Sequence, residues 1–518
     1  MPRRLPPWAL TAVGAVAWLI ADPPTPDLVA HLYRAEIVRE AGLGVWEQGW
    51  YAGHHLPGYS VLMPPLAALT TPQLVAALAA VASTWCFTAL ARSHWGAQAA
   101  GAAALWFAIA ALSPLVGGQL AFAAGMAPAL GALLAGARDR RALAGGLAAA
   151  TTLTSPVAAA FLLLAVAAWW LAARPHAAVW VAAGTIAPGA LILVAFPQGG
   201  TQPFAFSSFA WSLAVALALL AVAGRREAAL RWGAALYVLA LVAGVTLDTP
   251  LGGNLVRLAA VFAGPLAAGA LWPERRLLLA LLAVPLLYWQ WLAPVRSVVR
   301  ASGDPAAHAA FHAPLIAELD RRATREGPMR IEIPFTANHW ETRYLPPRHP
   351  IARGWERQLD VRDNPIFYDA GALTPTRYRR WLDDLAVRYV ALAATRPDPA
   401  GRDEARLVRS GAVPGLREVW RGGAWLLFEV ERARALASAP LRVTRLGVDE
   451  VALSGSRAGT GTVRVRFTPY WKLVEGAGCV SRTPDGWTRV RLDRPGGARL
   501  AVRFSLARIG ADGPRCTR

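Results

Sequence analysis

Long apolar stretches recur through the first 295 residues of this chain, and they constrain its fold more than any other feature. A helix needs about 20 mostly apolar residues to cross the roughly 30 Å hydrocarbon core of a membrane. The sequence therefore predicts a mostly α-helical membrane protein with about eleven transmembrane helices. We place them at residues 5–21, 71–91, 97–116, 119–137, 142–154, 156–173, 177–196, 206–223, 232–247, 256–272 and 277–295.

Charge divides the chain at about residue 296. Residues 1–296 contain 16 Arg and 9 acidic residues, whereas the shorter remainder contains 37 basic and 24 acidic residues. This shift predicts a membrane domain at 1–296, which includes a large first outer loop at 22–70, followed by a water-exposed part.

Two folded layers are expected in that second part. Residues 297–435 predict an α/β domain, with strands at 329–333, 386–393 and 424–430 and a helix at 375–385. Residues 436–518 alternate apolar residues with Arg at 463–467, 488–492 and 499–504, which is typical of a small antiparallel β-sandwich.

The positive-inside rule orients the membrane domain. If Thr152–Pro156 is a turn, all the basic loops fall on one side; if residues 142–173 form one long helix, the later basic loops fall on the other. The first arrangement predicts a cytoplasmic N-terminus and an extracytoplasmic C-terminal part in a bacterial plasma membrane. Residues 1–21 also have features of a signal peptide, but no good cleavage site follows, so we expect a retained first span.

Composition argues against two function classes. The net charge is +20, but the Arg residues are mixed with acids and no nucleic-acid-binding motif occurs, so nucleic acid is not an expected partner. No Asp, Glu or Lys lies at the middle of a predicted span, whereas ion-coupled transporters usually need ionisable groups there.

Cys479 and Cys516 both lie in the C-terminal part and could pair in an oxidising compartment.

The first outer loop is rich in reactive side chains. Thr25 and Pro26 predict the start of a helix that ends near Gly42. On it Asp27, His31 and Arg34 have the spacing of one helical face, so a base, a proton partner and an anion clamp are available together. A purely structural explanation of Asp27 is also open, because the helix dipole favours an acidic residue in the first turn of a helix.

Other polar and aromatic residues are candidates for substrate contact. Aromatic side chains suit sugar rings and also suit the headgroup belt of a bilayer, and adjacent histidines rarely bind one metal ion. We expect anionic groups of a substrate to bind at two places. One is Arg257, near Asn254 in the GGNLVR turn, and the other is the loop between the strand at 329–333 and the helix at 375–385. The remaining candidates are Glu36, Trp50, Tyr51, His54, His55, His339, Trp340, Arg353 and Trp355.

The chain resembles the GT-C class of membrane glycosyltransferases. The layout is similar: an inside N-terminus, one span, then a large outer loop with an acidic residue just after the span. Two segments resemble the first-loop region of bacterial members: DLVAHLYRAEIVREAGLGVW and GWYAGHHLPGYSVLMPPL. Three segments in later outer turns resemble these members more weakly: LSPLVGGQLAF, TTLTSPVAAAF and GGNLVRLAAVF.

The resemblance implies transfer of a sugar from a polyprenyl-phosphate carrier to a hydroxyl of a glycan, lipid or protein of the cell envelope. It implies that Asp27 is the catalytic base. Many relatives carry a paired acid at this point, whereas Leu28 follows Asp27 here, which leaves Asp22 and Glu36 as alternative bases and leaves open a divalent metal, Mg²⁺ or Mn²⁺.

Two other functions remain as alternatives. A lipid or glycan transporter or flippase would need charged residues facing a central cavity. A non-catalytic, sugar-binding membrane scaffold would not need Asp27. For the enzyme we expect a groove for a lipid phosphate that opens near Asp27 and Arg257.

Overall fold

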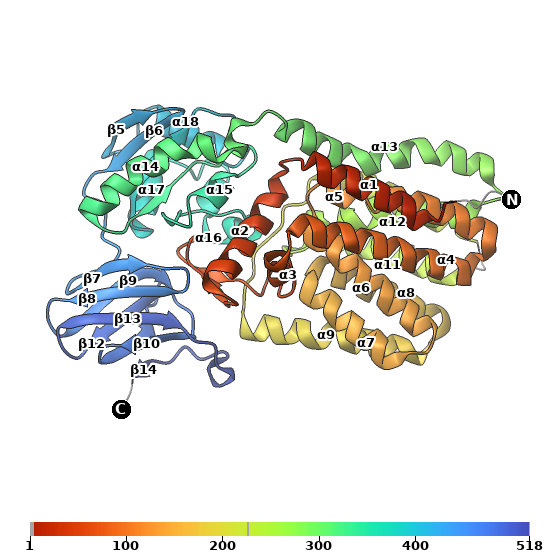
Figure 1. Ribbon diagram of the computed structural model, residues 1–518, viewed down its shortest axis with the longest axis horizontal. Coiled ribbons are helices and arrows are strands. Elements are labelled where there is room, and N and C mark those ends of the chain that lie inside the picture. The colour runs from red at the N-terminus through yellow and green to blue at the C-terminus, as the bar shows by residue number, and fades with distance from the viewer. Residues whose placement is uncertain (1–4, 225–226, 517–518) are drawn as a thin grey trace. The chain divides into compact units, whose positions relative to one another are not determined.

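In the computed structural model, which describes residues 5–224 and 227–516, the chain forms two compact units (Figure 1). The first comprises residues up to Glu36, Tyr59–Leu193 and Gly200–Ser302. The second comprises Ile37–Gly58, Val194–Gly199 and residues from Gly303 onward. The predicted boundaries near residues 296 and 435 stay a prediction, but the segment 37–58 of the first loop belongs with the C-terminal part of the chain.

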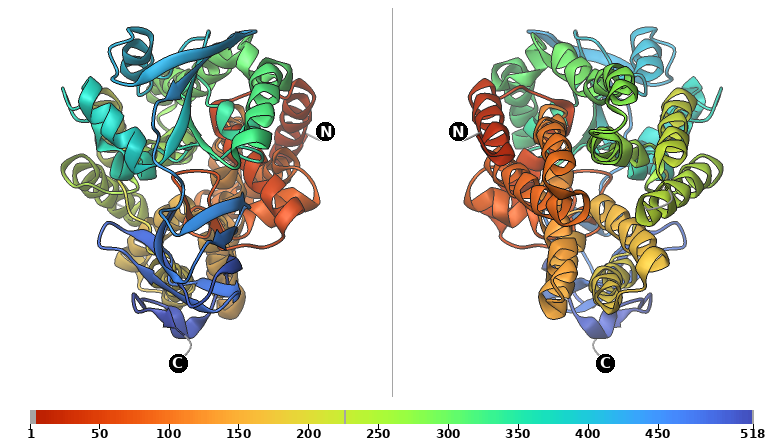
Figure 2. Two further views of the ribbon diagram at one scale, coloured as in Figure 1. Left: turned by 90° about the vertical axis from the view of Figure 1, so that its left-hand side faces the viewer. Right: turned by 90° about the vertical axis from the view of Figure 1, so that its right-hand side faces the viewer.

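The first unit is a bundle of helices, which Figure 2 shows end-on in its right-hand view. Every predicted span lies on a helix of this unit or continues one residue or a few beyond it. The helices are α1 (Pro7–Ala21), α2 (Pro26–Ala41, shared with the second unit), α3 (Met63–Leu69), α4 (Pro72–Ala110), α5 (Ser113–Val116), α6 (Leu120–Ala137), α7 (Arg141–Thr154), α8 (Pro156–Ala173), α9 (His176–Ala195), α10 (Phe206–Val222), α11 (Ala228–Thr246), α12 (Val256–Leu271) and α13 (Arg276–Ala301).

Among residues 5–224 and 227–516, seven helical segments are long and apolar enough to cross a membrane, so the unit is suited to a bilayer. The number of eleven crossings stays a prediction. Two predicted spans, 71–91 and 97–116, lie on the one long segment formed by α4 and α5, in which the non-helical Gly96 interrupts α4. The chain is also interrupted between α7 and α8 at Ser155, whose side chain accepts a hydrogen bond from the Ala158 N–H; it therefore does not form one long helix at 142–173.

Contacts join loops that were predicted to lie on the same side of the membrane, although the topology itself stays a prediction. At one end of the bundle Glu227, which follows α10, accepts hydrogen bonds from His94 Nε2 (2.8 Å) and Trp95 Nε1 (2.9 Å), near the break in α4. Both loops were predicted to be cytoplasmic. Loops predicted to be extracytoplasmic also meet, because the Val61 N–H donates to the Leu153 carbonyl.

Small residues let the helices pack closely. A Cβ placed at Gly125 of α6 would lie 2.9 Å from Ala158 of α8. Polar contacts add to this packing, because the hydroxyl of Thr11 lies 2.9 Å from that of Thr84 and donates to the Ala108 carbonyl. Both features are typical of helices that associate in lipid, where the hydrophobic effect does not drive them together.

The second unit contains the predicted α/β layer. A four-stranded sheet has the order β3-β4-β6-β5, in which β3 and β4 are parallel and the other pairs are antiparallel. Its strands are β3 (Arg330–Glu332), β4 (Val387–Ala393), β5 (Leu416–Gly422) and β6 (Trp425–Val430), and its helices are α14 (Ala309–Glu326), α15 (Glu341–Tyr344), α16 (Arg357–Asp363), α17 (Pro375–Asp384) and α18 (Arg402–Arg409).

Two antiparallel four-stranded sheets follow, in the orders β10-β13-β8-β7 and β14-β11-β12-β9. Side chains of one sheet contact the other, since a Cβ at Gly461 would lie 2.9 Å from Leu441. The strands are β7 (Leu441–Leu446), β8 (Glu450–Gly455), β9 (Gly459–Arg466), β10 (Trp471–Glu475), β11 (Gly478–Arg482), β12 (Trp487–Leu492), β13 (Gly496–Val502) and β14 (Arg515–Cys516).

The two C-terminal cysteines lie opposite each other on neighbouring strands. The ladder between β11 and β14 pairs Cys479 with Cys516. Cys479 is disulfide-bonded, whereas Cys86 is a free, buried cysteine. The segment 37–58 is also held in this unit; it forms the short hairpin of β1 (Trp46–Glu47) and β2 (His54–His55), and the Gln48 N–H donates to the Val448 carbonyl.

Candidate functional site

The face of α2 predicted from sequence exists in the structure. α2 begins at Pro26 and ends at Ala41, and Leu28 and Ile37 are buried. Asp27, His31 and Arg34 lie one turn apart along one side, since residues i, i+4 and i+7 share a helical face.

The carboxylate of Asp27 faces a guanidinium from a distant part of the sequence. Asp27 Oδ2 lies 3.8 Å from Arg257 Nη2, and both side chains are partly exposed, at 27% and 22%. Arg257 is at the start of α12, immediately after the 3₁₀ turn Gly252–Leu255 that contains Asn254. The Asn254 N–H donates to the Leu251 carbonyl, and the residue is half-buried.

The two alternative bases lie elsewhere. Asp22 caps the end of α1, and its Oδ1 accepts a hydrogen bond from Gln73 Nε2 at 2.9 Å. Glu36 is nine residues after Asp27 on α2, which places it about 180° around a helix with 3.6 residues per turn. Asp27 forms an ion pair with Arg257, and the choice of the base among the three acids stays a prediction.

His31 and Tyr59 complete the cluster. Tyr59 Oη lies 3.4 Å from His31 Nε2, and the Arg34 guanidinium carbon lies 3.9 Å from the centre of the Tyr59 ring. Burial and the positive charges of Arg34 and Arg257 lower the pKa of His31 to about 3. The imidazole is consequently neutral at physiological pH and adds no charge to a site that contains two Arg and one Asp.

A glycine allows the loop after α5 to approach α2. Gly118 has φ +78°, and a Cβ there would lie 2.3 Å from Thr25 Oγ1 and 3.2 Å from Asp27 Cβ. A side chain at this position would therefore clash with the first turn of α2 and displace Asp27.

An apolar cavity of about 430 Å³ begins beside this cluster. Arg257 lies over the ring of Phe122, with 5.9 Å between the guanidinium carbon and the ring centre, and Phe122 lines the cavity. From there the cavity continues between α4, α6, α8, α11 and α12 to Trp95 and Glu227, at the end of the bundle where the predicted cytoplasmic loops meet. Its wall is almost entirely apolar, and includes Leu130, Phe161, Leu162, Leu258, Phe262 and Leu266.

The other predicted residues of the first loop lie in the second unit, in its interior. Trp50 Nε1 donates to the Thr342 carbonyl (2.9 Å), and the Tyr51 hydroxyl donates to the Glu356 carbonyl (2.9 Å). His55 Nε2 lies 3.0 Å from the Thr468 hydroxyl. These buried side chains join the segment 37–58 to distant parts of the unit; their predicted contact with sugar stays a prediction.

His54 lies between two carboxylates. Its Nδ1 is 2.9 Å from Glu47 Oε1, and its Nε2 is 3.5 Å from Glu356 Oε1. Although burial lowers the pKa of His54, the two glutamates raise it to about 9. The group is a protonated, buried ion-pair centre and not an exposed metal ligand.

The predicted loop residues 339–355 also contribute to buried contacts of the second unit. Arg353 donates to both oxygens of Asp360 (3.0 and 2.6 Å) and to Glu404 (2.8 Å). Trp340 is buried against Tyr344, and His339 Nε2 lies 3.5 Å from Asp398 Oδ2. Trp355 is half-buried. Because it is already saturated by two carboxylates, Arg353 is better placed to hold the fold than to bind an anion.

No group of three His, Cys, Asp or Glu side chains that could hold a metal ion occurs among residues 5–224 and 227–516. Three residues of the Asp27 cluster were not among the predicted site residues: Tyr59, Gly118 and Phe122. The aromatic GY pair in the first loop and the GG pair after Val116 were the available signals, but neither indicates by itself that it faces Asp27.

No known protein family and no curated protein matches the chain. Among solved structures, it is similar to the arabinofuranosyltransferase AftD from mycobacteria, with a TM-score of 0.47 and 14% sequence identity. The match covers 97% of this chain, which spans 60% of that one.

Proposed function

We propose that the chain is a membrane glycosyltransferase of the GT-C class, which moves a sugar from a polyprenyl-phosphate carrier to an acceptor hydroxyl at the extracytoplasmic face. The observation that carries this proposal is the position of Arg257. It lies 3.8 Å from the partly exposed carboxylate of Asp27 and over Phe122, at the end of a long apolar cavity. An anionic head and an apolar chain can bind there side by side.

The chemistry follows from these groups. The Asp27 carboxylate accepts the proton of the acceptor hydroxyl as its oxygen attacks the anomeric carbon. The bond between that carbon and the phosphate oxygen breaks, and its electron pair leaves with the phosphate. Arg257 stabilises the negative charge of the departing phosphate, and the positive charge of Arg34 adds to the local potential. The Tyr59 ring packs against the Arg34 guanidinium, and its hydroxyl faces the neutral His31.

The cavity fits the carrier chain. A polyprenyl chain is branched and apolar, and its transfer from water into such a cavity is favourable at about 25 cal/mol per Å². Few charged side chains line the cavity, and those that do, His94 and Glu227, already contact each other at its far end. A conduit for a polar substrate would need polar groups along its length, so the cavity favours lipid binding over passage of a glycan.

The first test measures transfer with purified wild type and Asp27→Asn on a panel of radiolabelled polyprenyl-phosphate sugars with membrane-derived acceptor. We expect Asp27→Asn to reduce the loss of label from the lipid at least about 100-fold, in the range of general-base catalysis, while donor binding is retained. Glu40→Gln, an exposed carboxylate on the last turn of α2, is the matched control and should transfer like wild type.

Asp22→Asn and Glu36→Gln test the alternative bases. Undiminished transfer by Asp27→Asn together with loss in either of these variants would move the base and keep the class. Binding of donor without transfer by wild type, across the whole panel, would contradict the enzyme and favour a transporter or a scaffold.

A further inference from the structure

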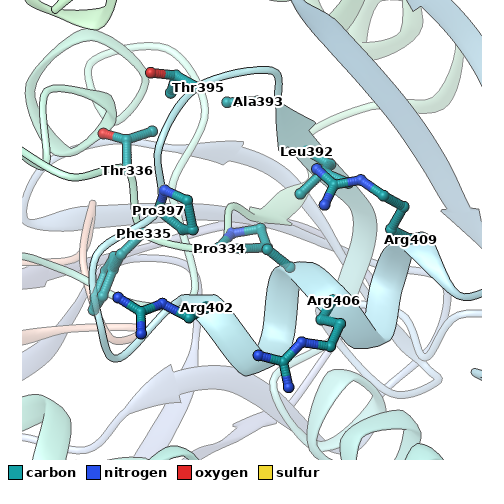
Figure 3. Close-up of a pocket in the computed structure, with 11 residues that line it drawn as sticks. Pro334, Phe335, Thr336, Leu392, Ala393, Thr395, Pro397, Arg402, Arg406 and Arg409 are labelled. Atoms are coloured by element: carbon teal, nitrogen blue, oxygen red, sulfur yellow. The ribbon is translucent and has the colours of Figure 1, made fainter.

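A second cavity lies in the α/β layer of the second unit, within one compact part of the chain. It has a volume of about 210 Å³ (Figure 3). Its residues follow the two parallel strands: Pro334, Phe335 and Thr336 come after β3, and Thr395 and Pro397 come after β4. In open α/β sheets, ligands bind at the carboxyl ends of parallel strands.

Three arginines of one helix form the charged wall of this cavity. Arg402, Arg406 and Arg409 of α18 have the spacing i, i+4 and i+7, so they share a face, whereas Ala405 and Val408 are buried. Figure 3 shows the guanidinium groups of Arg402 and Arg409 toward opposite ends of the cavity, with Pro334 between them in this view. The eleven residues that line the cavity include no acid.

These arginines are not neutralised within the unit. Arg406 Nη2 lies 3.2 Å from Asp403 Oδ1, but both side chains are more than 70% exposed, so the pair is weak in water. The side chains of Arg402 and Arg409 have no carboxylate partner among the residues that the structure describes. Three positive charges therefore lie along the edge of a hollow, with one solvent-exposed counter-charge.

The buried side of α18, the helix that carries these arginines, is held by hydrogen bonds. Glu404, on the buried side of α18, accepts hydrogen bonds from Arg353 (2.8 Å) and from the Tyr378 hydroxyl (2.8 Å). Arg353 in turn lies 4.0 Å from the ring of Phe335 in the cavity wall. Because these contacts are buried, the arginines are presented by a rigid support, which lowers the entropic cost of binding.

We propose that this cavity binds an anionic saccharide, with a phosphate or carboxylate group held by Arg402, Arg406 and Arg409 and a sugar ring against Pro334, Leu392 and Pro397. Guanidinium groups bind such oxyanions through paired, charge-assisted hydrogen bonds. A cavity of this size holds one substituted ring, so the other rings of a short oligosaccharide would extend from it into solvent. Such a saccharide could be the acceptor of the transfer reaction, and this part of the inference rests on the proposed function. The binding of an anionic saccharide does not rest on it.

The experiment measures binding to the purified full-length protein by isothermal titration calorimetry. The probes are three trisaccharides of equal length: one with uronic acid carboxylates, one with phosphate groups and one without charge. The variant is Arg402→Gln/Arg409→Gln. The matched control is Arg377→Gln/Arg380→Gln, which removes two exposed arginines from α17, outside the cavity.

We expect at least one anionic trisaccharide to bind at least ten-fold more tightly than the uncharged one, and the double variant in α18 to lose at least about ten-fold of that affinity. The control variant should bind like wild type. Equal binding of all three trisaccharides, no binding of any, or equal loss in both double variants would overturn the proposal. Equally tight binding of inorganic phosphate would show that the sugar makes no contact and would overturn it as well.

Transfer is assayed separately on the same variants. If Asp27→Asn abolishes transfer while anionic saccharide still binds, both proposals stand. If wild type shows no transfer but the saccharide binds through α18, only the proposed function fails. If transfer depends on Asp27 and no anionic saccharide binds, only this inference fails.

Discussion

At the scale of single residues, the position of Asp27 depends on a contact that a side chain would destroy. Gly118 lies against Thr25 and Asp27 with a backbone conformation that L-residues rarely adopt. The loop that carries it connects α5 to α6 and thereby brings two distant parts of the first unit to the start of α2. Gly118 is thus a positioning residue for the proposed base.

Gly118→Ala should lower the transfer rate at least about ten-fold, because a displacement of a reacting group by about 1 Å can cost 100-fold. The adjacent Gly117 is the matched control: it has φ −78°, and a Cβ there would lie 3.4 Å from the Ser113 carbonyl, an ordinary contact. Steady-state assays should show the loss in kcat for Gly118→Ala, with donor binding and helix content unchanged. Equal activity of the two variants would contradict the positioning role.

His54 gives the second unit a pH dependence. Its pKa is raised to about 9 in the folded protein, against 6.5 for an unperturbed imidazole. The ion pairs with Glu47 and Glu356 therefore stabilise the fold fully below pH 6.5, and this contribution is lost as the pH rises to 9. For this buried group the loss is on the order of 3 kcal/mol.

Hydrogen–deuterium exchange of the segment 46–58 at pH 6.5 and pH 9 measures this loss. The intrinsic exchange rate is divided out, and wild type should then exchange faster at pH 9. His54→Gln should exchange fast at both pH values. His55→Gln is the control, since burial lowers the pKa of His55 to about 3 and the residue stays neutral over this range. A pH response that survives His54→Gln would assign it to another group.

At the scale of elements, the length and periodicity of the apolar segments predicted which parts of the chain form apolar helices. All the predicted spans coincide with helices because apolar runs bounded by Pro, Gly and Arg carry their own signal. The same holds for α2, whose first turn is marked by Thr25 and Pro26. The spacing of Asp27, His31 and Arg34 thus predicted about half of the cluster around Asp27, whose role in catalysis stays a prediction.

The other half comes from elements that meet only in the tertiary structure. Arg257 is 230 positions away from Asp27 in the sequence, although the two side chains form an ion pair. No local pattern distinguishes Arg257 from an arginine that only flanks a membrane span. Likewise, the aromatic segment 46–55 reads like a surface loop, yet its side chains find hydrogen-bond partners near residues 342, 356 and 468 and are buried. α18 and its row of arginines were missed because its eight residues are too short for an apolar period.

The cavity can be tested through one side chain of α6. Ala129 lines it, so Ala129→Phe should occupy part of the space available to a long carrier chain. We expect KM for a long polyprenyl-phosphate sugar to rise about ten-fold, while a donor with a short prenyl chain is used as by wild type. Ala127→Phe, on the same helix but facing a different cavity, is the control. An equal rise for both donors would show that the cavity does not hold the chain.

At the scale of the whole molecule, the orientation in the membrane stays a prediction, and two features agree with it. Cys479 is disulfide-bonded, and disulfides persist in oxidising compartments, which favours an extracytoplasmic C-terminal part. The basic loops provide the second feature, because Trp95 and Glu227 join two of them at one end of the bundle, as the positive-inside rule requires. The cluster at Asp27 lies at the start of a helix that follows α1, on the opposite side by this rule.

Thiol labelling in intact cells tests the orientation directly. The background is Cys86→Ala, which removes the free cysteine. Asp248→Cys lies on an exposed loop predicted to be extracytoplasmic, and Ser93→Cys lies on an exposed part of α4, just before its break at Gly96, that is predicted to be cytoplasmic. A membrane-impermeant maleimide should label Asp248→Cys in intact cells and both variants after permeabilisation. Labelling of Ser93→Cys alone in intact cells would place the Asp27 cluster in the cytoplasm, where the proposed donor and the disulfide would both lose their explanation.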